Sequence, residues 1–324
     1  MKKNDDIEVI AKKLAEAENV LIFPHIVMDG DALGSGAALC EALRNSGKTA
    51  HILIEDKIPD NLAFLDRGFC TTDVDVIKDP DVCICIDCGD TGRFPKRAEK
   101  FMTGKTLICV DHHATSEPFC DYNHIESSSA ATAELVYLLL RAAGAEITKE
   151  IAESIFAGIT TDTGDFQYSN TTKRTHEIVS ALYDCGMDFS KVSIELYENE
   201  NPKKMKLQNM IVGSTEFFAD GQLAMACVTQ KMLKECGCTM EESEGTVSML
   251  RSVRGVQIAI ILKENTKKSI KATLRSKSVG DVSAIAVKHG GGGHVRAAGC
   301  TINDTLEQAK EAIREDALEE LGYK

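Results

Sequence analysis

Acidic side chains and imidazoles gather at four points of this 324-residue sequence. The four points are His25-x3-Asp29-x-Asp31, Asp87, Asp111-His112-His113 and Asp162. Carboxylate and imidazole groups without paired cysteines suit manganese, or iron, better than structural zinc. A carboxylate can bridge two ions, and two ions about 3.5–4 Å apart can hold both the attacking and the leaving oxygen of a displacement. The four clusters therefore predict a two-metal hydrolytic site.

Other interpretations of the first cluster fit less well. An EF-hand also opens with Asp-x-Asp, but Leu33 stands at its fifth position and Cys40 at its twelfth, where glutamate is needed. The glycines match neither the dinucleotide-binding nor the Walker pattern. A helix N-cap would account for Asp31 alone, but not for His25 or Asp29. A metal site is the interpretation that accounts for all three.

The elements that would position these residues alternate between strands and helices. The strand patterns cover Val20–Phe23, His51–Ile54, Val82–Ile86 and Leu107–Val110. The helical patterns cover Asp31–Ser46, Ala130–Ala143 and Lys149–Ile159. Such alternation predicts an α/β fold with a doubly wound, mostly parallel sheet. Because ligands bind beyond the carboxyl ends of such strands, the acidic clusters are expected to converge on one rim.

The second half of the chain predicts a helical connector and a smaller α+β domain. A helix over about 172–184 closes the first domain, and residues 188–213 are polar with a helical pattern. Strands are then predicted over Thr215–Phe218, Leu223–Thr229, Val256–Lys263 and Ile270–Arg275, with helices at about 281–288 and 304–321. The predicted organisation is a catalytic domain over 1–187, a linker over 188–213 and a substrate-binding domain over 214–324.

Charge is distributed unevenly along the chain. The formal net charge of −13 argues against a protein that coats long duplex nucleic acid. Residues 245–300, however, carry ten lysines or arginines against two acids. A basic region on an acidic body favours a short anionic ligand, although some of these lysines are expected to be only a solvated strand face.

The sequence also bears on location. No apolar run approaches the roughly 18 residues of a membrane helix, and the N-terminus does not resemble a secretory signal. Twelve cysteines in a long chain without an export signal favour reduced thiols in the cytoplasm. A homodimer is left open.

A run of four glycines, Gly290 to Gly293, precedes His294 in the basic region. Backbone N–H groups without side chains can approach phosphate oxygens closely and form an anion-binding concavity. His294 and Arg275 would add charged donors. Gly291, Gly292, Gly293, His294 and Arg275 are therefore predicted to bind substrate; a flexible hinge is the alternative.

Taken together, the four acidic clusters resemble the signature motifs of the DHH phosphoesterase superfamily. Leu274-Arg275-Ser276, the glycine run with His294, and Ala297-Ala298-Gly299 resemble its DHH-associated C-terminal domain. The resemblance spans nearly the whole chain and is strongest to the compact nanoRNase (oligoribonuclease) and pAp phosphatase subfamily. Met28 is a departure, because that subfamily usually has proline there; the change removes no ligand.

The resemblance implies a role for each residue of the predicted site. One ion would be held by His25, Asp29 and Asp87, and the other by Asp31, Asp87, His112 and Asp162. The two catalytic residues would be His113, facing the scissile phosphate, and Asp111, orienting a histidine ring.

The implied activity is a phosphohydrolase with two Mn²⁺ ions. Its substrates would be short RNA or DNA oligonucleotides, and 3′-phosphoadenosine 5′-phosphate (pAp), which would give AMP and phosphate. The phosphoester would be held between the two domains. Cleavage of cyclic or linear dinucleotides is the nearest alternative. A RecJ-type exonuclease and a family II pyrophosphatase fit the chain less well, and a non-catalytic nucleotide-binding module is an alternative of another class.

Overall fold

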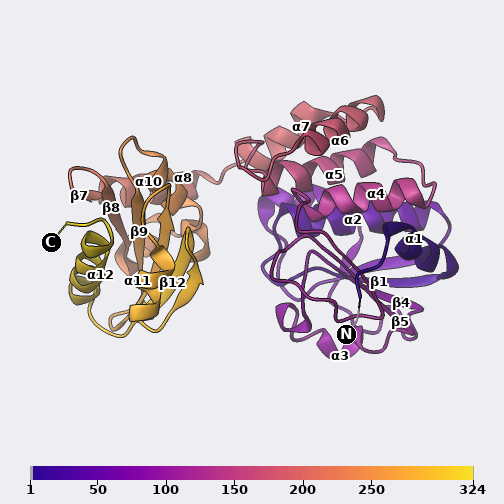
Figure 1. The fold of residues 1–324 in the computed structure, drawn as a ribbon, viewed down its shortest axis with the longest axis horizontal. Helices are drawn as coiled ribbons and strands as arrows, with labels where there is room; N and C mark the ends of the chain where they lie inside the picture. Colours follow the sequence, from indigo (N-terminus) through magenta and orange to yellow (C-terminus); the bar gives the residue numbers. More distant parts are fainter. Residues whose placement is uncertain (1–2, 324) are drawn as a thin grey trace. The chain divides into compact units, whose positions relative to one another are not determined.

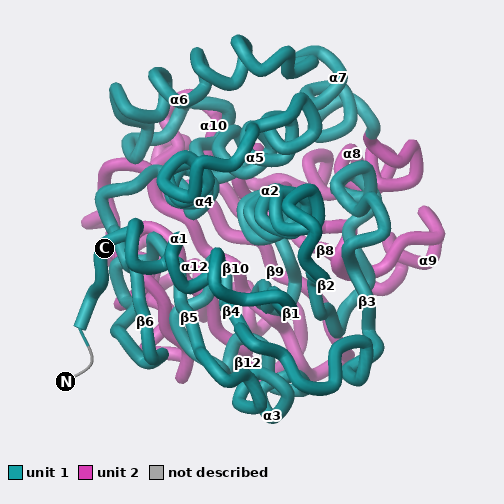
Figure 2. The backbone as a smooth tube through the Cα atoms, turned by 90° about the vertical axis from the view of Figure 1, so that its right-hand side faces the viewer, with its two compact units in different colours: residues 1–199 teal, residues 200–324 magenta. Residues whose placement is uncertain are grey.

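The computed structural model describes residues 3–323, in two compact units divided between residues 199 and 200 (Figures 1 and 2). Each unit is built around one six-stranded sheet. The predicted connector, 188–213, comprises α7 (Phe189–Ser193) and the π-helical turn η3 (Ile194–Glu198) of the first unit and α8 (Pro202–Gly213) of the second. Within the described residues, no helix is both long and apolar enough to span a bilayer.

The sheet of the first unit is parallel throughout, in the order β3-β2-β1-β4-β5-β6. Its strands are β1 (Asn19–Phe23), β2 (Thr49–Leu53), β3 (Cys70–Thr71), β4 (Val82–Ile86), β5 (Thr106–Asp111) and β6 (Tyr122–Ile125). The predicted doubly wound α/β architecture is confirmed, with two edge strands, β3 and β6, that the sequence patterns do not predict. The order reverses between β1 and β4, and ligands of open α/β sheets bind at such a switch point.

Both faces of this sheet are covered, which explains why all five residues of β4 are apolar and buried. On one face lie α1 (Ile7–Glu16), α2 (Gly30–Asn45), α4 (Thr132–Ala142) and α5 (Lys149–Asp162), with α6 (Lys173–Asp184) packed on α5 (Figure 1). The other face packs aromatic rings and cysteines beside the short helix α3 (Ala98–Phe101). The 3₁₀ turns η1 (Asp60–Leu65) and η2 (Thr91–Arg93) complete the unit.

Glycines allow α2 and α5 to approach each other closely. A Cβ atom on Gly34 would lie 2.5 Å from a backbone carbonyl of α5, and one on Gly158 would lie 2.9 Å from Asp31 Oδ1. Gly30 is the first residue of α2, where a Cβ would lie 2.4 Å from Thr161 Oγ1. This contact places Asp31 beside α5.

The second unit contains a mixed sheet in the order β11-β12-β10-β9-β8-β7, with β8 and β9 parallel and the other neighbours antiparallel. Its strands are β7 (Glu216–Phe218), β8 (Leu223–Val228), β9 (Ile258–Thr266), β10 (Ser269–Ser276), β11 (Gly292–His294) and β12 (Ala297–Ile302). This arrangement confirms the smaller α+β unit that the sequence predicts.

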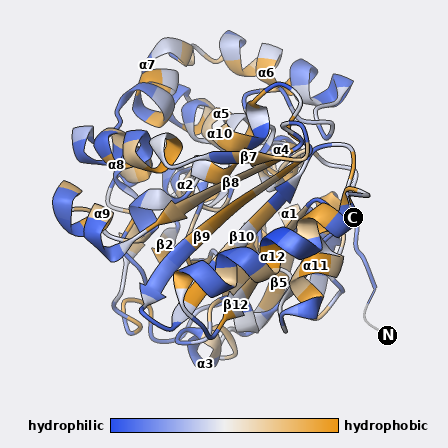
Figure 3. Cartoon of the chain, turned by 90° about the vertical axis from the view of Figure 1, so that its left-hand side faces the viewer, coloured by the Kyte–Doolittle hydropathy of each residue, from blue (hydrophilic) through white to orange (hydrophobic). Residues whose placement is uncertain are grey.

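Helices cover both faces of this second sheet as well. One face packs against α11 (Val282–Lys288) and α12 (Leu306–Glu320). The other packs against α8, α9 (Gln230–Cys236) and α10 (Thr246–Ser252), with the 3₁₀ turn η4 (Glu241–Ser243) before α10. Figure 3 shows that β9 is hydrophobic over its first part and hydrophilic at its end, whereas hydrophilic and hydrophobic residues alternate along α12. The core of this unit therefore lies on the two faces of its sheet.

Gly34→Ala is expected to destabilise the first unit, whereas Gly36→Ala on the same helix is not. At residue 34 the new methyl group would meet the Ser154 carbonyl oxygen at 2.5 Å, so the helices must separate, at a cost of about 1–3 kcal/mol. At residue 36 the nearest atom is Ile52 Cδ1 at 3.4 Å, and alanine favours the helix by up to about 1 kcal/mol. Denaturant unfolding followed by circular dichroism measures both; equal stability of the two variants would contradict the close contact.

Candidate metal centre

The carboxyl ends of β1 and β4 bring together a first group of candidate metal ligands, His25, Asp29 and Asp87. His25 Nε2 lies 3.6 Å from Asp29 Oδ2 and 3.4 Å from Asp87 Oδ2. Asp29 also caps α2, because its Oδ1 accepts the N–H groups of Asp31 at 3.1 Å and Ala32 at 3.0 Å. The cap that the sequence suggests for Asp31 is thus made by Asp29, whose second oxygen faces His25.

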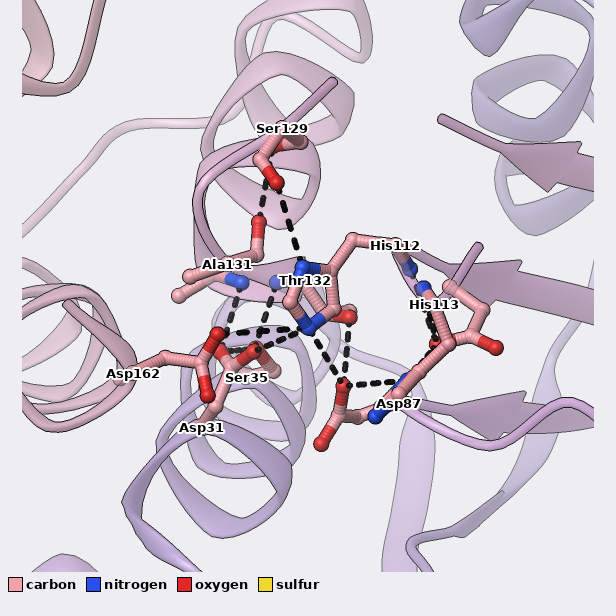
Figure 4. Close-up of polar contacts among 12 residues, drawn as sticks. Asp31, Ser35, Asp87, His112, His113, Ser129, Ala131, Thr132 and Asp162 are labelled. Carbon is pink, nitrogen blue, oxygen red and sulfur yellow. Dashed lines mark hydrogen bonds and ion pairs between the residues drawn. The ribbon is translucent and has the colours of Figure 1, made fainter. Parts of the chain in front are cut away.

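A second group lies beside the first and consists of Asp31, His112 and Asp162 (Figure 4). His112 follows β5, Asp31 lies in the first turn of α2, and Asp162 ends α5. His112 Nε2 lies 3.8 Å from Asp31 Oδ2 and 3.4 Å from Asp162 Oδ2. The same nitrogen is 3.6 Å from Asp87 Oδ1, so Asp87 faces both groups. The structure therefore brings together all six residues predicted to bind metal.

Hydrogen bonds to backbone carbonyls orient both histidine rings. His25 Nδ1 lies 2.6 Å from the carbonyl oxygen of Ile26, and His112 Nδ1 lies 3.2 Å from that of Ser129. Because a carbonyl oxygen can only accept, the neutral rings carry their proton on Nδ1. Nε2 is then the atom that faces the carboxylates, and a metal ion bound there would take the place of any Nε2 proton.

Asp31 is only 1% exposed, so its charge has to be balanced inside the protein. The N–H groups of Thr132 and Ala133 donate to its two oxygens at 2.7 and 2.8 Å. These groups begin α4, so the carboxylate meets the positive end of that helix. Even so, burial and the nearby charge of Asp87 raise the pKa of Asp31 well above its usual range.

Two further groups of the site bind protons more tightly than usual. Burial lowers the pKa of His25, but its hydrogen bonds with Asp29 and Asp87 outweigh this and raise that pKa to about 10. Burial raises the pKa of Asp162 to about 6, with His112 opposing the rise and Asp87 adding to it. The site thus holds more negative charge than its histidines balance, and a donor set of oxygens and imidazoles fits divalent manganese.

His113 has a different environment from His112. Its side chain is 46% exposed, and its Nδ1 lies 2.7 Å from Asp111 Oδ1 but 3.6 Å from Asp87 Oδ1. Asp111 is fully buried and also accepts a hydrogen bond from Ser116 Oγ. The Asp111 hydrogen bond, opposed by burial, raises the pKa of His113 to about 9. His113 therefore holds a proton at neutral pH, and Nε2 is the atom that can donate it.

Asp87 adopts a left-handed backbone conformation, with φ of 58°. Outside glycine this conformation costs roughly 1–2 kcal/mol. Its N–H group donates to the carbonyl oxygen of Val110 at 3.0 Å, which holds the strained residue against β5. The side chain is 2% exposed, with Oδ2 toward His25 and Oδ1 toward His112. The strained backbone of Asp87 therefore occurs where one buried carboxylate has to face two groups of candidate ligands.

The predicted substrate-binding residues lie in the second unit, at the β10-β12-β11 edge of its sheet. Arg275 on β10 and His294 on β11 both pair with Ala297 on β12. Residues paired across a ladder share one face, so both side chains project from the same face, with their backbones about 10 Å apart.

Part of the glycine run forms strand β11 rather than a loop. A Cβ on Gly291 would lie 2.2 Å from the carbonyl oxygen of Gly299, and one on Gly293 would lie 2.5 Å from that of Ala297. Gly292 has open space around it. Close contact with β12 therefore accounts for two of the three predicted glycines.

Three polar residues of the site escape the sequence patterns. Thr132 donates its hydroxyl to Asp87 Oδ1 at 2.8 Å, Ser129 accepts from His112, and Ser116 donates to Asp111. The sequence feature that could have indicated Ser129 and Thr132 is their place beside the predicted start of a helix at residue 130. Helix N-termini favour carboxylates, so residues there can lie beside an acid. Ser116 carries no such signal.

Comparisons with known proteins match both units. The DHH family, N-terminal domain, matches residues 19–159, and the DHHA1 domain matches residues 221–322. The bifunctional oligoribonuclease and PAP phosphatase NrnA of Thermus thermophilus is 30% identical over 98% of this chain and 96% of its own length. The protein of the same name from Bacillus subtilis is 26% identical over 88% of this chain and 90% of its own.

A solved structure of an exopolyphosphatase-related protein from Bacteroides fragilis superposes with a TM-score of 0.89 at 27% identity. It covers 97% of this chain, and this chain covers 95% of it. The similarity therefore extends through both units.

Binding of Mn²⁺ is expected to release protons, so its affinity should rise from pH 6 to pH 8. With a pKa of about 10, His25 is protonated over this range, and a metal ion must displace that proton. Each displaced proton increases the apparent affinity by up to about tenfold per pH unit. Calorimetric titration in buffers of different ionisation enthalpy counts the protons. His25→Asn should lower the count and His51→Asn should not; an affinity independent of pH would contradict this account.

Proposed function

Because this chain belongs to the DHH family of phosphoesterase hydrolases, we propose that it is a manganese-dependent enzyme that degrades short oligoribonucleotides to mononucleotides and converts pAp to AMP. The observation that carries the proposal is the position of Asp87, whose two oxygens face His25 and His112 at 3.4 and 3.6 Å. A carboxylate in that position can bridge two ions. Two-ion sites are suited to phosphoester hydrolysis because they act on both the attacking and the leaving oxygen.

The substrate part of the proposal is supported by relatives and by charge. The two relatives described above are named as oligoribonuclease and PAP phosphatase, and the alignment with each runs through both units. Residues 245–300 of the second unit carry ten basic residues against two acids, which favours an anionic ligand. The overall charge of −13 disfavours long nucleic acid. Short oligonucleotides and pAp satisfy both conditions.

The proposed metal ligands are His25, Asp29 and Asp87 for one ion, and Asp31, Asp87, His112 and Asp162 for the other. Two bound Mn²⁺ ions would supply an activated water and would polarise the phosphoryl group. His113 is the proposed acid: its hydrogen bond to Asp111 favours the charged ring, which could give its Nε2 proton to the leaving oxygen. Asp111 fixes the ring through Nδ1 and balances its charge. Asp87 and the hydrogen-bonded histidines hold the ligand geometry before substrate arrives.

Arg275 and His294 are the proposed contacts for the substrate's phosphates. They project from the same face of the sheet, and arginine can form two parallel hydrogen bonds with a phosphate. Gly291, Gly292 and Gly293 are proposed to let the backbone approach the ligand there.

Asp87→Asn is expected to abolish hydrolysis while the protein still folds. Asparagine tolerates the left-handed conformation and keeps the side-chain shape, but it removes the charge that both metal groups share. Values of kcat/KM should fall by about 10³-fold or more, which corresponds to about 4 kcal/mol. Asp90→Asn is a matched control, because Asp90 follows the same strand, is exposed and only caps η2. Activity of the Asp87 variant equal to that of the wild type would contradict the metal assignment.

A panel of substrates separates the proposed activity from its alternatives. The protein with Mn²⁺ would be assayed on RNA oligonucleotides of a few residues, pAp, cyclic dinucleotides and pyrophosphate, comparing kcat/KM. The proposal expects the first two to be preferred. Preference for cyclic dinucleotides or pyrophosphate would overturn it, and calorimetric binding of pAp without turnover would point to a non-catalytic module.

Arg275→Ala is expected to raise KM for pAp by about 10-fold or more and to leave kcat within a few-fold of wild type. The reason is that a contact with a phosphate that does not react contributes to binding of substrate and transition state alike. Lys268→Ala is the control for loss of one positive charge. Lys268 lies in the turn just before β10, at the opposite end of the strand from Arg275. A fall in kcat with unchanged KM would contradict a purely binding role.

A further inference from the structure

Thr132 is in contact with carboxylates from two different parts of the first unit (Figure 4). It is fully buried and is the first residue of α4. Its N–H group donates to Asp31 Oδ2 at 2.7 Å, and its Oγ1 donates to Asp87 Oδ1 at 2.8 Å. One residue therefore joins the acid at the start of α2 to the acid at the end of β4.

The hydroxyl group selects one of the two oxygens of Asp87. Oδ1 receives it, and this is the oxygen that faces His112 at 3.6 Å. Oδ2 faces His25 at 3.4 Å. A carboxylate oxygen has two lone pairs, so Oδ1 can accept from Thr132 and still bind a cation. The hydrogen bond thus fixes the rotation of the Asp87 carboxylate about its Cβ–Cγ bond. That rotation decides whether the two oxygens face both groups of candidate ligands or only one of them.

The position of Thr132 is itself fixed by buried polar contacts. Glu134, on the first turn of α4, is fully buried and accepts from Ser129 Oγ at 2.9 Å and from Thr175 Oγ1 at 2.6 Å. The backbone carbonyl of Ser129 in turn accepts from His112. The turn before α4 and the start of the helix therefore form one rigid support, which reaches His112 through a carbonyl and Asp87 through a hydroxyl.

We propose that Thr132 is a positioning residue that holds Asp87 as the bridge between the two metal ions, and thereby sets the affinity for the second ion. This inference rests on the proposed two-ion function. One ion would be held by His25, Asp29 and Asp87, and the Asp87 oxygen on that side faces His25 rather than Thr132. The other would be held by Asp31, Asp87, His112 and Asp162, and Thr132 donates to both Asp31 and Asp87 on that side. Loss of the hydroxyl is therefore expected to weaken binding of the second ion more than binding of the first.

The test compares Mn²⁺ binding by wild type, Thr132→Val and Thr132→Ser. Valine keeps the branched shape and the N–H group but removes the donor, while serine restores the donor. Calorimetry gives the number of ions and the affinity for each, and electron paramagnetic resonance detects the exchange coupling of two neighbouring Mn²⁺ ions. Neither readout depends on turnover.

Thr246→Val is the matched control. Thr246 is likewise a fully buried threonine at the first position of a helix, α10 in the second unit, where its hydroxyl donates to the carbonyl oxygen of Ser243. It tests for the general effect of replacing such a threonine by valine. Thr132→Ala provides a second variant without the donor if the valine variant does not fold.

The expected result is that wild type, Thr132→Ser and Thr246→Val bind two ions and show the coupled signal. Thr132→Val should bind the first ion nearly as well, bind the second about 10- to 100-fold more weakly, and lose the coupled signal at low Mn²⁺. Two ions bound by the valine and alanine variants with wild-type affinity would overturn the role of Thr132 and leave the two-ion proposal standing. A single ion bound by the wild type would overturn both.

Discussion

The concentration of negative charge at the carboxyl ends of β1, β4 and β5 is the constraint on which the first unit depends. Asp31, Asp87 and Asp111 are each at most 2% exposed. Burying an ionised carboxylate without partners costs several kcal/mol, so each acid must meet its donors where it lies. Asp31 meets the start of α4, Asp87 meets a threonine hydroxyl, and Asp111 meets a histidine and a serine. The fold therefore has to place a hydrogen-bond donor beside each buried carboxylate.

The sheet topology and the helix packing together place the acids and their donors beside one another. The strand order reverses between β1 and β4, so the chain leaves these two neighbours in opposite directions and the space beyond their ends stays open. The glycine-lined contact between α2 and α5 then brings Asp31 and Asp162 to that space from helices rather than strands. The candidate oxygen and nitrogen ligands thus come from four separate segments of the chain, and the packing of each segment holds its ligands in place.

The sequence predicts the fold class and the gathering of the six candidate ligands, because apolar strands that end in acids are a local pattern. It fails where the cause is not local. Thr132 and Ser129 look like ordinary polar residues before a helix, and their partners lie far away in the chain. Strand β6, Tyr122–Ile125, contains asparagine and histidine and pairs only at the sheet edge within the described residues, so no apolar run marks it. The role of Gly30 also depends on a helix more than a hundred residues later.

The glycine run before His294 has a consequence for strand register. In a ladder, a slip of one residue turns every side chain to the opposite face, and short glycine-rich edge strands resist slipping only weakly. Here a slip that moved His294 into the place of Gly293 would bring its Cβ to about 2.5 Å from the carbonyl oxygen of Ala297, where no side chain fits. Gly291 forms a second such slot against Gly299. Gly293 therefore opposes the slip that would carry His294 into its place, and the observed alignment keeps His294 on the face of Arg275.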